Sequence, residues 1–187
     1  LISADNVFIL NTIAFGHQLR SGTAQAELLA DVHQLGFQAV EIRNEFLSGN
    51  DSELVQIRDE AKHQQLEVYY SVNAPLFVQR EINPRFGQYI AEMHQLGASH
   101  LKLNFGEYPK DEMLILSDLG KYLDGSFEFN VENNQTPSES KLKDIVNFFT
   151  AIDHSNVDVG FCFDTANWYW TGNTPEEAAK LLSKSRR

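Results

Sequence analysis

Polar residues recur along this sequence at the ends of short segments that alternate like β-strands. They are Glu45, Asn73, Asn104, Glu132 and Asp164. Their spacing of about 30 residues is the length of one βαβ unit. A segment with helical periodicity follows each strand-like segment, so the chain is predicted to alternate between strands and helices. This pattern predicts an α/β protein with a parallel sheet.

Six strand–helix repeats are predicted. We expect strands at residues 8–15, 39–45, 66–73, 100–106, 127–133 and 159–164. We expect helices at residues 23–35, from 51 onward, and at 84–96, 111–122, 138–152 and from 174 onward. Asp51 and Thr174 are predicted helix caps, the latter followed by Pro175. Because no linker-like segment interrupts the repeats, residues 1–187 are expected to form a single domain.

Alternation within the strands distinguishes a barrel from an open sheet. Leu101, Leu103 and Phe105 alternate with Lys102 and Asn104. Central strands of a doubly wound open sheet are instead almost continuously apolar, because helices cover both faces. One apolar and one polar face suit a strand whose polar side lines a barrel interior. We therefore predict a (β/α) TIM-type barrel with about six of the usual eight βα units.

Charged residues on the predicted polar face must be paired, because an unpaired buried charge costs several kcal/mol. These residues are Glu41, Arg43, Glu67, Lys102 and Glu128. For the deeper Glu41 and Glu128, an internal network of ion pairs is as good an interpretation as a functional role. Residues nearer the strand ends are the better site candidates.

Composition argues against several classes of function. The 187-residue chain has 15 Lys and Arg against 26 Asp and Glu, a net charge of −11 that disfavours nucleic acid and anionic lipid. No apolar stretch reaches the roughly 20 residues of a membrane span, and a cytoplasmic location is expected. The single Cys162 is expected to be a buried, inert thiol. Sequence signatures of dinucleotide-binding proteins, NTPases and serine hydrolases are missing.

Glu132 and Asp164 are the strongest candidates for chemistry. Each closes a predicted strand, and the carboxyl ends of neighbouring parallel strands share one edge of a sheet. Carboxylate oxygens bind Mg²⁺ and Mn²⁺, and Zn²⁺ if histidines join them. The alternative remains that each carboxylate only caps the following loop by accepting backbone N–H bonds.

Amide and aromatic residues follow the same two strands. Asn133, Asn167 and Trp168 are of the kind that binds a polyol, because amides bond hydroxyl groups and rings cover C–H faces. Such aromatic residues could equally serve only in packing. His17 directly follows the first predicted strand and is expected at the same edge of the sheet.

Several segments resemble the sugar phosphate isomerase/epimerase family, whose members have the xylose isomerase-like TIM barrel. The resemblance covers nearly the whole chain and depends on the order and spacing of the motifs. The segments are Asn11 to Gly16, Leu35 to Arg43, Leu96 to Ala98, Val131 to Asn133 and Phe163 to Asn167.

The resemblance implies one divalent metal ion, Mn, Mg, Co or Zn, with Glu132 and Asp164 as two of four ligands. It implies that Glu132 also moves a proton next to a sugar carbonyl, through an enediolate. The expected substrate is a small sugar or sugar phosphate, and a homodimer is left open. Substrate contacts are assigned to Asn11, His17, Asn73, Asn104, Asn133, Asn167 and Trp168.

The sequence departs from the family pattern in two respects. Asn167 stands where members often have His, and strands seven and eight, with the remaining His and Glu ligands, are absent. The chain is therefore expected to be a fragment, a truncated product or one completed by a partner. A lyase of the inosose or 3-dehydroshikimate dehydratase type and a non-catalytic sugar-binding barrel are the alternative functions.

Overall fold

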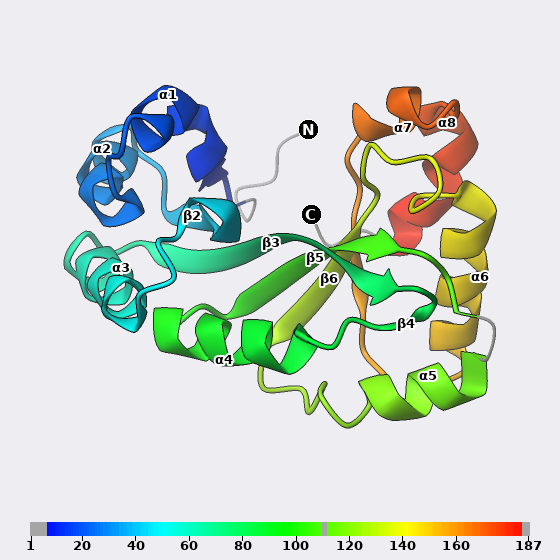
Figure 1. Ribbon diagram of the computed structural model, residues 1–187. Helices are drawn as coiled ribbons and strands as arrows, with labels where there is room; N and C mark the ends of the chain where they lie inside the picture. The colour runs from blue at the N-terminus through cyan, green and yellow to red at the C-terminus, as the bar shows by residue number, and fades with distance from the viewer. Residues whose placement is uncertain (1–6, 110–111, 185–187) are drawn as a thin grey trace. The chain divides into compact units, whose positions relative to one another are not determined.

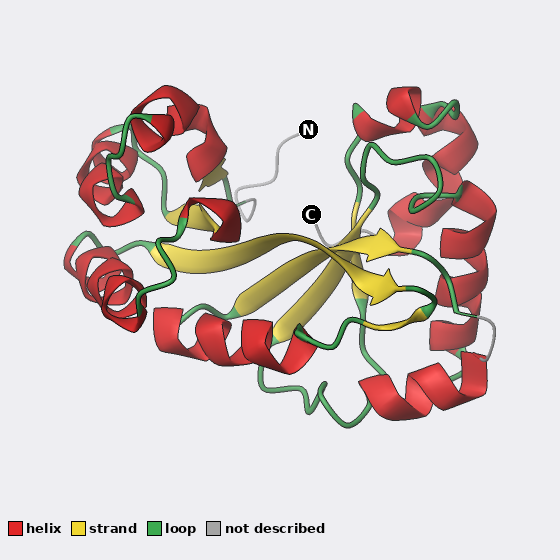
Figure 2. Ribbon diagram, viewed as in Figure 1, coloured by secondary structure: helices red, strands yellow, loops and turns green. Residues whose placement is uncertain are grey.

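A computed structural model describes residues 7–109 and 112–184 (Figure 1). Helices and strands alternate along these residues, as the strand-end spacing predicts (Figure 2). The chain forms two compact units that interleave in sequence: unit 1 comprises residues 1–72 and 89–101, and unit 2 comprises residues 73–88 and 102–187. Strands β3 (Glu67–Val78) and β5 (His100–Gly106) and helix α4 (Phe86–Leu96) each contribute residues to both units.

Unit 1 begins with three parallel strands. β1 (Ile9–Asn11) pairs with β2 (Ala39–Arg43), which pairs in turn with the first residues of β3. In the chain, α1 (Gly16–Arg20) and α2 (Leu29–Gln34) lie between β1 and β2, and α3 (Asp51–His63) lies between β2 and β3. Turns of 3₁₀ helix are found at Thr12–Phe15, Gln25–Leu28 and Asn44–Phe46. The buried core of this unit includes Leu29, Val32, Val40, Ile42 and Ile57. These are the apolar positions of the periodic segments, so burial of one face per element explains the pattern.

Unit 2 carries the C-terminal strands and helices. Its elements are β4 (Glu81–Ile82), α5 (Glu112–Leu119), β6 (Glu128–Glu132), α6 (Leu142–Asp153), β7 (Gly160–Cys162), α7 (Asn167–Trp170), α8 (Pro175–Ala178) and a 3₁₀ helix at Ala179–Lys184. β6 and β7 pair in parallel, and Glu132 lies opposite Cys162. Thr174 and Glu177 form the predicted cap of the last helix, each side chain bonding the other's backbone N–H.

An aromatic cluster fills the core of unit 2. Phe148 of α6 packs edge-on against Phe77 and Phe105, with ring centroids 5.6 and 5.5 Å away. Phe149 packs against Phe161 of β7 in the same manner, at 5.5 Å. Buried edge-to-face aromatic pairs add about 1 kcal/mol each to the stabilisation from burial alone. This cluster fixes α6 on the apolar side of the strands (Figure 1).

Neighbouring strands follow the order β1-β2-β3-β5-β6-β7, and β5 has its predicted bounds. Several other predicted bounds were wrong. The first strand ends at Asn11 because its side chain accepts from the N–H of Ile13 and starts a 3₁₀ turn. The N-cap of α3 is Asn50 rather than Asp51.

The largest difference from the predicted elements follows the third strand. β3 continues to Val78 and turns back as β4, so one pair in the sheet is antiparallel. The turn residues Gln79 and Arg80 have φ of 52° and 67°, a left-handed conformation that sequence patterns without Gly or Asn do not indicate.

In the residues that the structure describes, no helix is long and apolar enough to span a bilayer.

Gly106 ends β5 where the backbone passes close to β3. Its φ is +91°, and a Cβ atom added there would lie 2.3 Å from the Phe77 carbonyl oxygen and 2.7 Å from Pro75 Cβ. The N–H of the next residue, Glu107, donates to this carbonyl at 3.0 Å. Any side chain at residue 106 would therefore separate two bonded backbone segments.

Gly106→Ala should destabilise the protein by about 3 kcal/mol or more, since left-handed strain and a backbone clash add together. Gly125→Ala is the matched control, because Gly125 has a φ of +82° and no atom within 4 Å of the added Cβ. It should lose only about 1 kcal/mol from backbone strain. Urea unfolding of both variants measures the difference, and equal losses would contradict the close approach at Gly106.

Candidate active site

Glu132 and Asp164 lie at the carboxyl ends of adjacent parallel strands, as the sequence predicts. Glu132 is the last residue of β6 and pairs in register with Cys162, so Asp164 lies two residues beyond the end of β7. Side chains two residues apart in extended chain point to the same side. The register therefore places the Glu132 carboxylate and the Cys162 thiol on one side of the strands.

The Glu132 carboxylate forms an ion pair within the sheet. Its Oε1 atom accepts from Lys102 Nζ of β5 at 3.1 Å and from Cys162 Sγ of β7 at 3.2 Å. The Lys102 and Glu132 side chains are only 7% and 15% exposed. Water screens such a pair weakly, and the charge-assisted bond is stronger than one between neutral groups. Three consecutive parallel strands thus hold one carboxylate oxygen.

Asp164 caps the chain segment that follows it. Its Oδ1 accepts from the backbone N–H of Ala166 at 2.8 Å and of Asn167 at 2.9 Å. This is the capping alternative that the sequence left open, and it engages one of the two carboxylate oxygens. These two bonds fix the turn that leads into α7.

Asn133 connects the ends of β6 and β7. Its Nδ2 donates to the Asp164 carbonyl at 2.9 Å, and its Oδ1 accepts from the Asp164 N–H at 3.0 Å. Its own carbonyl accepts from Asn167 Nδ2 at 2.8 Å. Asn133 is fully buried. Two of the predicted substrate-binding amides thus make bonds within the protein: Asn133 to the Asp164 backbone and Asn167 to the Asn133 backbone.

The aromatic residues after β7 divide between core and surface. Trp168 is fully buried, and its ring lies 5.8 Å from that of Phe163. Within the described part of the chain, its buried Nε1 has no hydrogen-bond partner. Tyr169 and Trp170 are instead 66% and 68% exposed. The two aromatic residues that follow Trp168, rather than Trp168 itself, present aromatic faces to solvent.

The other predicted substrate contacts lie in different places. Asn104 Nδ2 donates weakly to Asn73 Oδ1 at 3.4 Å, so these two side chains of unit 2 come together. Asn11 and His17 belong to unit 1, where Asn11 starts the first 3₁₀ turn and His17 is an exposed residue of α1. Their role as substrate contacts remains a prediction.

Glu132 and Asp164 are the two acidic residues that the family resemblance assigns to a metal ion. Within residues 7–109 and 112–184, no three or more His, Cys, Asp and Glu side chains are grouped so that they could hold a metal ion. Glu132 Oε1 is bonded to a lysine, and Asp164 Oδ1 to two backbone amides. A metal ion would have to compete with a cation for the first oxygen. Metal dependence therefore stays a prediction from the family resemblance.

Sequence reasoning missed the roles of Lys102 and Cys162. It expected Lys102 to be paired but assigned Glu132 to a metal ion, and it treated Cys162 as inert. The structure makes Cys162 partly exposed and a donor to Glu132. The alternation in the sequence indicated that Lys102 lies on the polar face, and Cys162 stands two residues before Asp164. It did not indicate which side chains on neighbouring strands pair with each other.

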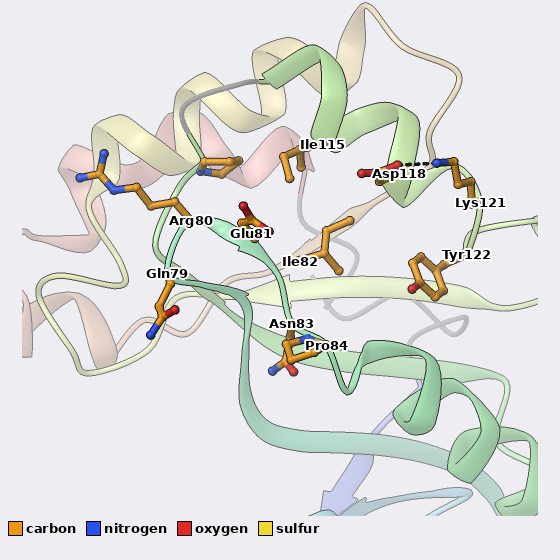
Figure 3. Close-up of a pocket in the computed structure, with 11 residues that line it drawn as sticks. Gln79, Arg80, Glu81, Ile82, Asn83, Pro84, Ile115, Asp118, Lys121 and Tyr122 are labelled. Atoms are coloured by element: carbon orange, nitrogen blue, oxygen red, sulfur yellow. Dashed lines mark hydrogen bonds and ion pairs between the residues drawn. The ribbon is translucent and has the colours of Figure 1, made fainter.

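A separate pocket of unit 2, with a cavity volume of about 730 Å³, lies between the β3–β4 turn and α5 (Figure 3). Ile82, Ile115 and Tyr122 line it, together with an ion pair in which Lys121 Nζ lies 2.5 Å from Asp118 Oδ1. The hydrogen bond that Lys121 donates to the Asp118 carboxylate raises the pKa of Lys121 above its usual value. The pocket contains no residue that the sequence assigned to the site.

The fold is that of xylose isomerase-like TIM barrel proteins, with about six βα units. The chain superposes on a sugar phosphate isomerase/epimerase from Parabacteroides distasonis ATCC 8503 with a TM-score of 0.60 and 13% identity, covering 100% of this chain and 76% of that one. Superposition on an L-ribulose 3-epimerase gives a TM-score of 0.61 at 17% identity and covers 87% of this chain and 61% of that one. This confirms the predicted fold and the structural likeness to sugar isomerases and epimerases.

The fold is shared with proteins of other activities. A xylose isomerase-like TIM barrel/4-hydroxyphenylpyruvate dioxygenase fusion protein gives a TM-score of 0.59 at 14% identity, over 86% of this chain but 27% of that one. A type I 3-dehydroquinate dehydratase from Clostridium difficile gives a TM-score of 0.52 at 13% identity, over 84% of this chain and 58% of that one. No protein-family model and no curated protein matches the sequence. At these identities the likeness establishes the fold alone.

Asn133→Asp should destabilise the protein by about 2–3 kcal/mol. The substitution keeps the shape but turns the Nδ2 donor into an oxygen that faces the Asp164 carbonyl oxygen, leaving both without a proton between them. Asn156→Asp, at an exposed residue of the same unit, adds the same charge and should change the free energy of unfolding by less than about 0.5 kcal/mol. Urea unfolding checks both, and similar values would contradict the role of Asn133.

Proposed function

We propose that this chain acts on a small sugar or sugar phosphate as an isomerase or epimerase, by moving a proton next to a carbonyl group. The observation that carries the proposal is the Glu132 carboxylate, which lies at the carboxyl end of a strand and is held by a buried lysine. Sites of (β/α) barrels lie at this end of the strands. The likeness to a sugar phosphate isomerase/epimerase and to an L-ribulose 3-epimerase supports the substrate class.

The proposed reaction begins with Glu132 as the general base. Its ionised carboxylate removes the proton from the carbon beside the substrate carbonyl, and the electron pair of that C–H bond forms the C=C bond of an enediolate. The carbonyl oxygen then carries the negative charge. Return of the proton to the former carbonyl carbon, while the hydroxyl proton of the first carbon passes to the charged oxygen, gives the isomerised sugar. Return to the original carbon from the opposite face, through a second acid, gives the epimer.

Asn73 and Asn104 are the proposed contacts for substrate hydroxyl groups in unit 2. Asn104 Nδ2 donates to Asn73 Oδ1 at 3.4 Å, near the limit of hydrogen-bond length, and a substrate hydroxyl group could compete for this bond. The exposed rings of Tyr169 and Trp170 replace the buried Trp168 as proposed aromatic contacts. Asn133 acts by positioning the Asp164 backbone, and Asn167 by holding the Asn133 carbonyl.

A lyase is the second candidate, because a dehydratase shares the fold. Dehydration begins with the same proton abstraction but ends with loss of a hydroxyl group from the next carbon. The two reactions are separated by the product, which is an isomeric sugar in one case and an unsaturated or deoxy keto compound in the other. A non-catalytic sugar-binding barrel would bind sugars without proton exchange.

Glu132→Gln should slow proton abstraction by about 10²–10⁴-fold, because the amide keeps the shape but cannot accept the proton. The measurement is deuterium incorporation beside the carbonyl in D₂O, followed by proton NMR over a panel of ketopentoses, ketohexoses and their phosphate esters. Isomer or epimer formation in the same samples identifies the reaction.

Glu128→Gln is the matched control, since Glu128 lies on the same face of β6 at its other end and accepts from Asn130 Nδ2. It should retain the wild-type exchange rate. Exchange that is unchanged in Glu132→Gln would contradict the proposed mechanism. Sugar binding by the wild-type chain without any exchange would favour the binding barrel.

A further inference from the structure

We propose that Lys102 supplies the positive charge opposite Glu132 that a divalent metal ion would otherwise supply, so that proton transfer in this chain needs no metal. The inference deepens the proposed function and, in its catalytic part, depends on it. Lys102 is then a catalytic residue, whose ammonium group stabilises the negative oxygen of the enediolate.

Glu132 and Lys102 form a buried ion pair. Lys102 Nζ approaches Oε1 at 3.1 Å, and both side chains are more than four-fifths buried. A buried carboxylate needs a compensating charge and hydrogen bonds to remain ionised. Lys102 provides the charge, and Cys162 Sγ provides a second donor to the same oxygen at 3.2 Å. The carboxylate is thus neutralised by side chains of the sheet itself.

The same contacts oppose metal binding. A divalent ion on Oε1 would lie within a few ångströms of the Lys102 ammonium, and like charges at that distance repel strongly in a weakly solvated site. The other carboxylate, Asp164, has one oxygen committed to the N–H groups of Ala166 and Asn167. Both carboxylates that the resemblance assigns to a metal ion are therefore already engaged by groups of the protein.

The geometry assigns different tasks to the two oxygens of Glu132. Both described contacts fall on Oε1, which leaves Oε2 as the proton acceptor. A substrate carbonyl oxygen next to Oε1 would come within reach of the Lys102 ammonium. When the C–H proton moves to Oε2, the negative charge on Glu132 disappears and an equal charge develops on the substrate oxygen. The ammonium group can then turn from the carboxylate to the enediolate without a change in the net charge of the site.

Direct metal binding tests the charge assignment whether or not a substrate is found. The purified chain, first treated with EDTA and dialysed, is titrated with Mn²⁺ and with Zn²⁺ in a calorimeter. We expect no stoichiometric uptake at micromolar concentration. Uptake by the wild-type chain that disappears in Glu132→Gln would overturn the proposal, because it would make Glu132 a metal ligand despite Lys102.

Proton exchange tests the catalytic part. Lys102→Ala should lower the rate of deuterium incorporation by about 10²–10³-fold at saturating sugar, with a smaller change in sugar affinity. Added methylammonium should restore part of the rate, which it would not do if Lys102 served only to support the fold. Lys143→Ala, at an exposed lysine of α6, is the matched control and should keep the wild-type rate without added amine.

The remaining outcomes separate this inference from the proposed function. Wild-type exchange rates in Lys102→Ala, or exchange abolished by EDTA and restored by Mn²⁺, would overturn the role of Lys102 and leave the isomerase proposal standing. Absence of exchange with every sugar would reject the isomerase proposal and with it the catalytic role of Lys102. The metal titration would then still support or overturn the charge assignment.

Discussion

The ion pair between Lys102 and Glu132 is the interaction on which the candidate site depends. Each side chain comes from a different strand, and neither is exposed enough for water to stabilise its charge. Loss of either partner would leave a buried charge, so the pairing constrains β5 and β6 together. Cys162 extends the constraint to β7 by bonding the same carboxylate oxygen. A polar interior is tolerated at this place because its charges compensate one another.

Hydrogen bonds to the backbone also hold the ends of β6 and β7 in place. Asn133 is buried and bonds both the N–H and the carbonyl of Asp164, so the loops after β6 and β7 form one connected structure. The aromatic cluster around Phe148 supports these strands from their apolar side. Packing below and hydrogen bonding at the strand ends therefore fix the Glu132 carboxylate, and a general base works only if its position is fixed.

The sequence predicted the fold well because its signals are local and repeated. Period-two alternation gave β5 with its exact bounds, and the spacing of strand ends gave the parallel order of the strands. The β3–β4 turn was missed because Gln79 and Arg80 adopt a left-handed conformation that neither residue type favours. The 3₁₀ turn after Asn11 was missed because one side-chain bond to Ile13 ends the strand. A single contact of this kind produces no repeating pattern in the sequence.

By itself, the sequence determined that Glu132 and Asp164 end neighbouring strands, since parallel βα repeats bring successive strand ends to one edge. Tertiary structure decided what surrounds them. It gave Glu132 a lysine and a thiol, gave Asp164 two backbone amides, and buried Trp168 while exposing Tyr169 and Trp170. The physical reason is that a carboxylate's role depends on the donors and charges within about 4 Å, and those around Glu132 come from residues about 30 positions away.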